Sequence, residues 1–272
     1  MRPRSLAWWF GLALLSGCAH APTTRSDQRL RVMTYNIAAG NGNLDAIAAV
    51  VRANSSDIVA LQEVDVRWHA RSAFVDQATA LGAQLGMHVR FAPIYHVTSD
   101  SAPPREYGVA LLSRFPITAF TNQQLTRWST QPNAGPPSAM PGLLDATIDV
   151  LGAPVRVVNT HLDYRADPAV RIRQVAEMLT ILQTSDAPTL VLGDLNATPA
   201  APELAPLLAR YQDAWRDTSD HGLTYPAAAP AKRIDYVLSS PHFRAVAAYV
   251  PVTVASDHRP VVVDLVLRHG RR

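Results

Sequence analysis

The sequence contains a single cysteine, Cys18, in 272 residues. Because a disulfide needs two cysteines, the fold is built without an internal disulfide bond. The chain also lacks a His-Glu-x-x-His segment, and zinc sites commonly use cysteine or such paired histidines as ligands. Both absences argue against zinc and favour a metal that prefers oxygen ligands, if the protein binds a metal at all.

Lysine is nearly absent, since Lys232 is the only lysine among 25 basic residues. No cluster of arginines is visible of the kind that neutralises many nucleic-acid phosphates. The 25 basic and 22 acidic residues give the whole chain a formal charge of +3. Residues 1–17 contain two arginines and no acidic residue, so removing them leaves +1. This near-neutral charge argues against strong binding to duplex nucleic acid.

The apolar run at residues 6–15 is too short to cross a bilayer, but it follows Arg2 and Arg4 and has the size of a signal-peptide core. It ends in Leu-Ser-Gly-Cys at residues 15–18, which resembles the lipobox of bacterial lipoproteins. The resemblance implies cleavage before Cys18 and a lipid on that cysteine. We therefore predict a signal peptide over 1–17, a lipidated tether over 18–28 and one domain over 29–269.

Ala19 stands after the cysteine, where an aspartate would resemble an inner-membrane retention signal. We expect a lipid-anchored protein of the bacterial cell envelope, at the outer membrane on its periplasmic face or surface.

The composition of the chain, 48% hydrophobic and 17% charged, is that of an ordinary globular protein. Short apolar runs predict strands at residues 30–37, 57–63, 88–93, 107–113, 117–125, 155–161, 189–192, 233–238 and 261–267. Helical spacing predicts helices at 43–53, 73–85 and 167–183. We expect the turn at 114–116 to join its two strands as a hairpin, and 98–104 and 131–141 to be loops, the second near a site.

Polar side chains recur where predicted strands begin or end. Each has an ordinary interpretation when taken alone, as a cap, a turn residue or a core histidine. Asp194 and Asn196 lie two residues apart after Gly193, so in an extended chain they point the same way. The repeated placement predicts that these ends converge on one cleft, formed by Asn36, Glu63, His161, Asp194, Asn196, Asp235, Asp257 and His258.

This set could support metal-assisted hydrolysis of a phosphate ester. Glu63, Asp194 and Asp257 supply the hard oxygens that Mg²⁺ or Mn²⁺ prefers, and such a metal polarises a phosphoryl oxygen. An attacking water also needs a base, and His161 or His258 titrates near neutrality. A carboxylate on the imidazole would fix its tautomer, and Asp235 is the candidate partner of His258.

Seven segments together resemble the endonuclease/exonuclease/phosphatase superfamily: MTYNI (33–37), LQEV (61–64), YGVALLSRFPI (107–117), NTHLD (159–163), LGDLN (192–196), RIDYVL (233–238) and SDHRPV (256–261). The superfamily includes pancreatic deoxyribonuclease, abasic-site endonucleases, neutral sphingomyelinases and inositol polyphosphate phosphatases. The resemblance implies an α/β, four-layered sandwich, in which two mixed β-sheets pack face to face with helices outside and the site lies at one end of the sheets.

The resemblance also implies roles for the motif residues. Glu63 would be the main metal ligand, with Asn36 and Asp257 near the metal. Asp194 would position or activate the water, and Asn196 would contact the phosphate.

His161 and His258 would stabilise the pentavalent phosphate, with Asp235 behind His258. Whether Asp194 or His258 is the general base is left open by the sequence. We interpret Tyr107 as a packed strand residue. Residues 139–142, Ala-Met-Pro-Gly, lack the Glu-x-Arg-Gly of many similar bacterial members, so Arg105 and Arg233 are weak substitutes for that arginine.

The sequence therefore predicts a monomeric, divalent-metal-dependent hydrolase of phosphate esters, a phosphodiesterase held at the cell envelope by its lipid. The substrate stays open between nucleic acid and a lipid headgroup, because the charge is unfavourable for duplex binding and no hydrophobic insertion into a bilayer is evident. The alternatives are a secreted or periplasmic nuclease and a non-catalytic surface-binding lipoprotein that retains the fold.

Overall fold

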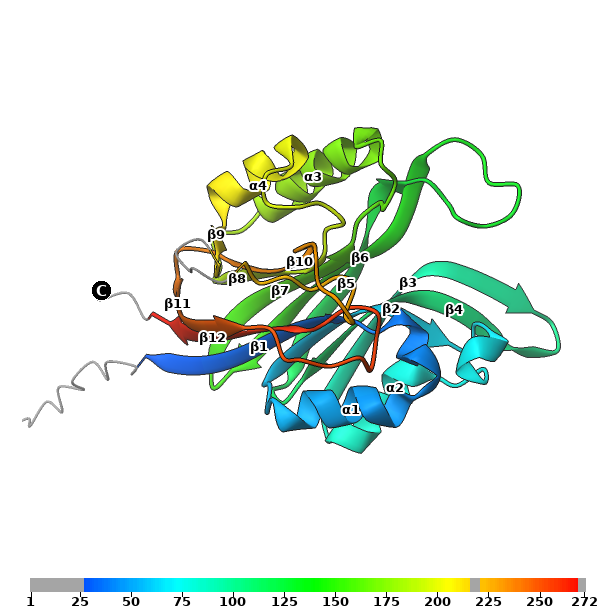
Figure 1. Ribbon diagram of the computed structural model, residues 1–272, viewed down its shortest axis with the longest axis horizontal. Helices are drawn as coiled ribbons and strands as arrows, with labels where there is room; N and C mark the ends of the chain where they lie inside the picture. The colour runs from blue at the N-terminus through cyan, green and yellow to red at the C-terminus, as the bar shows by residue number, and fades with distance from the viewer. Residues whose placement is uncertain (1–26, 216–220, 269–272) are drawn as a thin grey trace, which may run out of the picture.

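The computed structural model describes residues 27–215 and 221–268, so Cys18 and the predicted signal peptide lie outside the described residues. The described chain forms two six-stranded sheets (Figure 1). The first has the order β11 (Phe243–Tyr249), β12 (Val261–Leu267), β1 (Gln28–Asn36), β2 (Ile58–Val66), β4 (Ala102–Ser113) and β3 (His88–Ser99). The second has the order β5 (Ile117–Arg127), β6 (Ser138–Val150), β7 (Ala153–His161), β8 (Thr189–Asp194), β10 (Asp235–Ser239) and β9 (Gln212–Asp213).

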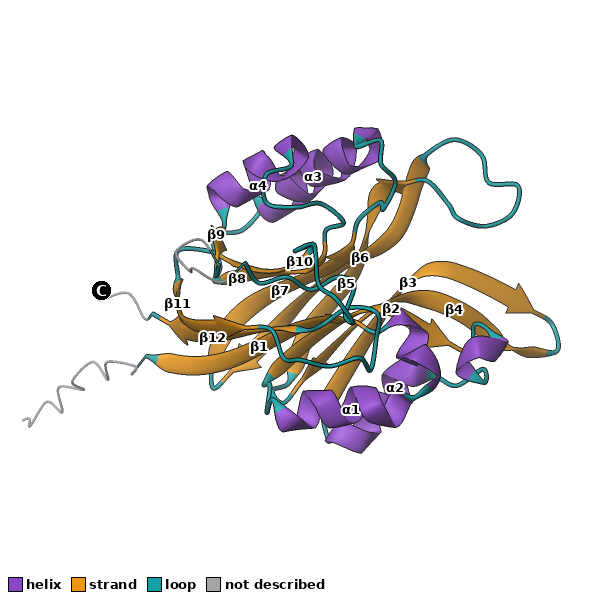
Figure 2. Ribbon diagram, in the orientation of Figure 1, coloured by secondary structure: helices purple, strands orange, loops and turns teal. Residues whose placement is uncertain are grey.

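Helices cover the outer face of each sheet (Figure 2). The helices α1 (Leu44–Ala53) and α2 (Gln77–Leu85) pack on the first sheet, and α3 (Ala169–Leu182) and α4 (Ala205–Arg210) pack on the second. Short 3₁₀ turns lie at Ala38–Gly42, Ala70–Ser72 and Pro202–Leu204. The predicted four-layered sandwich is confirmed. Within the described ranges, none of the helices has the length and apolar character needed to cross a membrane.

Three apolar layers hold the sandwich together. Val32 of β1 and Leu192 of β8 lie in the core between the sheets. The neighbouring Met33 faces α1 and α2, and Val191 faces α3. Because successive strand residues point to opposite faces and both faces are covered, the central strands are nearly continuous apolar runs.

Two parallel strand pairs determine where the site lies. The parallel strands β1 and β2 are connected through α1, and the parallel strands β7 and β8 are connected through α3. The carboxyl ends of each pair therefore lie side by side at one end of their sheet. His161 is aligned with Asp194 at the ends of β7 and β8. Asp235 begins the antiparallel β10 directly opposite Asp194. These polar strand ends are thereby brought to one end of the second sheet, in agreement with the predicted convergence.

The hairpin predicted around residues 114–116 is wrong. β4 pairs with β2 and β3 in the first sheet, whereas β5 pairs with β6 in the second, so this turn crosses between the sheets. The loop predicted at 98–104 is instead the tip of a long β3–β4 hairpin, in which Ser99 pairs with Ala102. Strand periodicity identifies strands without naming their partners, which explains both errors.

The second predicted helix begins later than residue 73. Ala73 adopts a left-handed backbone conformation, with φ of 49°, which interrupts a helix there. The side chain of Asp76 accepts a hydrogen bond from the Thr79 amide and starts α2 at Gln77. The first helix, by contrast, begins after Asn43 as predicted, and the Asn43 side chain caps it.

Candidate active site

Asn36 joins the two sheets at the site. Its side-chain Nδ2 donates to Glu63 Oε1 at 3.1 Å and to Asp194 Oδ2 at 3.1 Å. Its Oδ1 accepts a hydrogen bond from the Ala38 amide at 3.1 Å, which fixes the orientation of the side-chain amide. Asn36 is completely buried. One amide therefore connects a carboxylate of the first sheet to a carboxylate of the second.

Glu63 lies in a β-bulge. Leu61 pairs with Ala110 and Val64 with Gly108, so two residues of β2 stand opposite one residue of β4. Glu63 has a φ of 56°, in the left-handed region, which costs about 1–3 kcal/mol for a residue with a side chain. The bulge breaks the alternation of β2 at the point where Glu63 meets a cavity. Strain of this kind is typical of functional sites.

Asp194 follows a glycine that the packing requires. Gly193 has a φ of 147°, and a Cβ on it would lie 2.1 Å from the Thr160 carbonyl oxygen of β7. A glycine therefore lets β7 and β8 approach closely at the edge that carries the site. Asp194 is 1% exposed, and its Oδ1 accepts the Asn196 amide at 2.9 Å. Asn196 is half-buried, and its Nδ2 donates to the Leu162 carbonyl at 3.0 Å.

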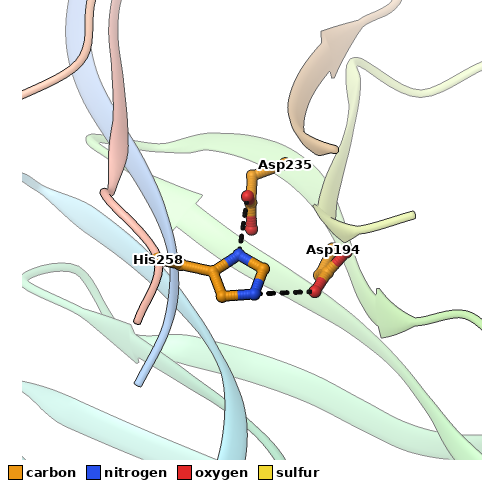
Figure 3. Close-up of side chains that lie close together, drawn as sticks. All are labelled: Asp194, Asp235 and His258. Atoms are coloured by element: carbon orange, nitrogen blue, oxygen red, sulfur yellow. Dashed lines mark hydrogen bonds and ion pairs between the residues drawn. The ribbon is translucent and has the colours of Figure 1, made fainter. Parts of the chain in front are cut away.

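His258 lies between two carboxylates (Figure 3). Its Nδ1 is 2.9 Å from Asp235 Oδ2, and its Nε2 is 3.7 Å from Asp194 Oδ2. The Thr224 hydroxyl donates to the same Asp235 oxygen, and the Tyr225 ring lies 4.7 Å from the imidazole. The predicted pairing of Asp235 with His258 is thus present in the structure.

The buried charges shift one another's titration. Burial by itself lowers the pKa of His258, but the carboxylates of Asp235 and Asp194 outweigh burial and raise this pKa to about 9. Burial, followed by repulsion from Asp235, raises the pKa of Asp194 to about 6. At neutral pH the imidazole therefore carries a proton, while Asp194 is mostly ionised.

His161 also approaches Asp194, with its Nε2 3.6 Å from the same Asp194 Oδ2 atom. Asp257 lies outside this buried group because its side chain is exposed. Its loop is nevertheless tied to the end of β1, since the Ser256 hydroxyl donates to the Asn36 carbonyl at 2.8 Å and also to Asp257 Oδ1 at 3.3 Å. The structure thus brings all the predicted site residues to one end of the sheets, with Asp257 at the solvent side.

A cavity of about 180 Å³ opens beside Glu63 and His161. Tyr107 is a strand residue of β4 packed against Trp68 and Tyr95, as interpreted from the sequence, and it also lines this cavity. The pKa of its hydroxyl is raised well above the ordinary value by burial and by the charge of Glu63. The bulge at Glu63, which strand periodicity does not reveal, places the two side chains at the same cavity.

Arg127 also lines the cavity and was not identified from the sequence. It is 7% exposed, and it donates to the carbonyls of His161 at 2.8 Å and Gly142 at 2.9 Å. It bonds to no carboxylate of the described chain, and burial lowers its pKa to about 10. Arg127 lies two residues after the buried Leu125 and therefore on the same face of β5. This spacing is the sequence signal that could have identified Arg127 as an inward-facing residue.

The two arginines considered from the sequence do not line the cavity. Arg233 pairs with Asp213 at 2.7 Å, and Arg105 is exposed on β4. Gly142 is the glycine of the Glu-x-Arg-Gly pattern, the part of it that residues 139–142 retain, and it makes room for Arg127. A Cβ at this position would lie 2.2 Å from Ile94 Cγ1 and 3.2 Å from Arg127 Nη2. The guanidinium beside Gly142 of β6 therefore comes from β5.

The donor set at this end fits a hard divalent cation. Mg²⁺ typically takes one or two carboxylates and keeps several waters, and Glu63 beside Asn36, with Asp257 on the adjoining loop, offers such a set. Asp194, Asp235 and His258 also each place a potential ligand atom within 4.8 Å of the others. In that second group, however, His258 already directs both ring nitrogens to the two carboxylates, an arrangement suited to holding a proton.

The fold and the buried carboxylate–histidine site together define a phosphoester hydrolase architecture. The Endonuclease/Exonuclease/phosphatase family profile matches residues 33–258. The chain therefore belongs to the endonuclease/exonuclease/phosphatase family, whose members are phosphoesterases and nucleases.

Several solved structures have a similar fold. An endonuclease/exonuclease/phosphatase from Beutenbergia cavernae is similar with 28% identity and a TM-score of 0.69, over 88% of this chain and 72% of that one. The human Nocturnin catalytic domain, solved with a bound sulfate, has 22% identity and a TM-score of 0.66, over 87% and 93%. A mannosyl-6-phosphatase of Bacteroides thetaiotaomicron has 18% identity and a TM-score of 0.62, over 87% and 99%. No curated protein sequence matches the chain.

Proposed function

We propose that the protein is a divalent-metal-dependent phosphodiesterase of the bacterial cell envelope. The observation that carries this proposal is the bridge from Asn36 to Glu63 and Asp194, beside the His258–Asp235 pair. A non-catalytic scaffold has no need of several buried carboxylates close together, because each one costs free energy when it is removed from water. The bridge therefore favours an enzyme over a surface-binding lipoprotein that only retains the fold.

Glu63, with Asn36 and Asp257, would hold Mg²⁺ or Mn²⁺. When bound, the metal supplies a Lewis acid that polarises the phosphoryl oxygen and neutralises developing charge. The protein side chains supply the rest of the chemistry, which consists of proton transfer and the binding of charge around the phosphorus.

Asp194 is better placed than His258 to accept the proton of the attacking water. His258 directs both ring nitrogens at carboxylates, which favours the imidazolium, and an imidazolium has no lone pair to accept a proton. We therefore assign the base to Asp194, held by Asn36 and the Asn196 amide. His258 and His161 would stabilise negative charge on the phosphorane, and Asp235 would keep His258 charged and oriented.

The location at the envelope rests on residues 6–18 alone, which resemble a lipoprotein signal with Cys18 as the lipidated residue. With this anchor the enzyme would meet phosphodiesters outside the cytoplasm. The absence of an arginine cluster argues against a duplex nuclease, so substrates that are small or single-stranded are favoured.

The direct test is hydrolysis of bis-(p-nitrophenyl) phosphate by the purified protein with Mg²⁺ and with a chelator. We expect metal-dependent turnover that falls at least 100-fold in Asp194→Asn and His258→Ala. Asp186→Asn and His88→Ala are matched controls, because both residues are exposed and distant from the site. No metal-dependent turnover, or full activity in His258→Ala, would refute the proposal.

A parallel comparison of substrates separates the alternatives. Plasmid DNA, single-stranded DNA, a phosphomonoester and sphingomyelin would be offered at the same concentration. A preference for plasmid DNA would favour the alternative of a secreted nuclease over the proposal.

A further inference from the structure

Three neighbouring aromatic rings lie next to the site. The ring centroids of Trp68, Tyr95 and Tyr107 lie 5.9 Å, 6.2 Å and 5.9 Å apart in the three pairs. Tyr95 and Tyr107 line the cavity that contains Glu63 and His161, and all three rings line a neighbouring cavity of about 250 Å³. These rings therefore extend from the candidate reaction centre outward.

Trp128 and Tyr164 line the same cavity as Glu63 and remain open to solvent, 43% and 63% exposed. The Arg165 guanidinium lies 4.7 Å from the Trp128 ring and 5.1 Å from the Tyr164 ring. We call the five aromatic residues and Arg165 the aromatic cleft. Large exposed aromatic side chains gathered at a cavity are unfavourable in water and are typical of binding surfaces.

Two polar groups of the cleft, and an arginine next to it, are already paired. The Tyr95 hydroxyl is bonded to Thr130 Oγ1 at 3.0 Å and accepts the Thr130 amide at 2.8 Å. Arg165 is paired with Asp163. Arg71, whose guanidinium lies 5.7 Å from the Tyr107 ring, is paired with Asp65 at 2.9 Å. The cleft offers a ligand several aromatic ring faces and the guanidinium plane of Arg165.

Nucleobases stack on aromatic and guanidinium faces such as these. We propose that the aromatic cleft binds the base of a nucleotide or of single-stranded nucleic acid whose phosphate lies between Glu63 and His161. The proposal rests on the proposed function, since it places the phosphate at that site. Because every base has a π-face, we expect little sequence preference.

Binding of two non-hydrolysable probes tests the proposal. The probes are the phosphonate analogues of AMP and of ribose 5-phosphate, which carry the same anionic group and sugar and differ in the base. Isothermal titration calorimetry with Mg²⁺ gives both affinities without turnover. We expect the AMP analogue to bind about 5- to 100-fold more tightly. Equal affinities would overturn the proposal.

Two variants locate the effect. Trp68→Leu and Trp128→Leu should each remove most of the preference for the AMP analogue while changing the affinity for the sugar analogue less than twofold. Phe74→Leu is the matched control, because Phe74 is 49% exposed and lines neither cavity. Thermal unfolding of each variant verifies that it is folded. An undiminished preference in both tryptophan variants would also overturn the proposal.

A third measurement excludes a lipid surface as the ligand. Phosphatidylethanolamine/phosphatidylglycerol vesicles would be mixed with the wild type and with Trp128→Leu. Tight vesicle binding that requires Trp128, together with equal affinities for the two probes, would assign the aromatic cleft to the membrane and overturn the proposal. Base preference without any phosphoester hydrolysis would refute the proposed function alone, whereas hydrolysis without base preference would refute this inference alone.

Discussion

The Nδ1 atom of His258 lies 2.9 Å from Oδ2 of Asp235, and the opposite nitrogen of the same ring faces Asp194 at 3.7 Å. A ring held in this way between two buried carboxylates is stabilised in its protonated form. The arrangement also keeps a positive charge next to the strand ends that carry Glu63 and Asp194. It separates the roles of the two groups, because His258 holds a proton in the pH range where Asp194 has lost its own.

The rate of phosphodiester hydrolysis should depend on pH as a bell-shaped curve. Activity should rise as pH increases through about 6, where Asp194 becomes ionised, and fall as pH increases through about 9, where His258 loses its proton. The measurement is kcat/KM against pH in buffers of constant ionic strength. Asp235→Asn should move the alkaline limb to lower pH, because His258 loses a neighbouring negative charge. An unchanged alkaline limb in this variant would contradict the assigned role of Asp235.

Mg²⁺ should stabilise the folded protein through Glu63. Binding to the native state alone raises the free energy of unfolding by about 2.7 kcal/mol at a concentration 100 times the Kd, which corresponds to about 5 °C or more in the unfolding midpoint. Thermal unfolding with Mg²⁺ and with chelator measures this shift without any substrate. Glu63→Gln should abolish it, whereas Glu106→Gln on the β3–β4 hairpin should retain it. An equal shift in both variants would place the metal elsewhere.

Replacing Arg127 should weaken substrate binding more than it weakens the fold. Arg127→Met removes a buried cation that has no carboxylate partner among the described residues, so we expect KM to rise about tenfold or more, with a stability loss of about 1 kcal/mol. Arg156→Met is the matched control, because it leaves its buried partner Asp145 unpaired, at a cost of about 3–5 kcal/mol, without touching the cavity. Arg127→Lys should give an intermediate KM. A normal KM in Arg127→Met would show that this guanidinium is only structural.

Gly193→Ala should destabilise the protein strongly. The new Cβ would lie 2.1 Å from the Thr160 carbonyl oxygen, and the residue would keep a φ of 147°, so β7 and β8 would have to separate. We expect a loss of about 3 kcal/mol or more in urea unfolding. Gly135→Ala is the control, because nothing lies within 4 Å of its added Cβ. Equal stability of the two variants would contradict the close approach seen here.

Several features were predictable because they depend on local chemistry. Asn36, His161 and Asp194 each end an apolar strand, and a polar group in that position belongs at a sheet edge. The pairing of Asp235 with His258 could be proposed from their residue types and from the motifs around them. The capped start of α1 at Asn43 is likewise a local hydrogen-bond pattern.

Other features depend on contacts that no local pattern encodes. Strand periodicity could not distinguish a β4–β5 hairpin from a crossover between sheets. In both arrangements two strands flank the same short turn, so the local sequence pattern is identical. The bulge that directs Glu63 and Tyr107 to one cavity is a mismatch between two strands distant in sequence. Arg127 is the only charged residue of β5 and would be expected at the surface, and only the packing of the fold buries it.

The sequence by itself determined which chemical groups the protein brings to its site, because strand ends, glycine turns and caps are properties of neighbouring residues. Only the tertiary structure decided how these groups are coupled. The hydrogen bond from Asn36 to Asp194 spans 158 positions and joins two different sheets. Its geometry follows from the packing of the two sheet faces against each other, which also buries Asp194 and thereby raises the pKa of its carboxyl group.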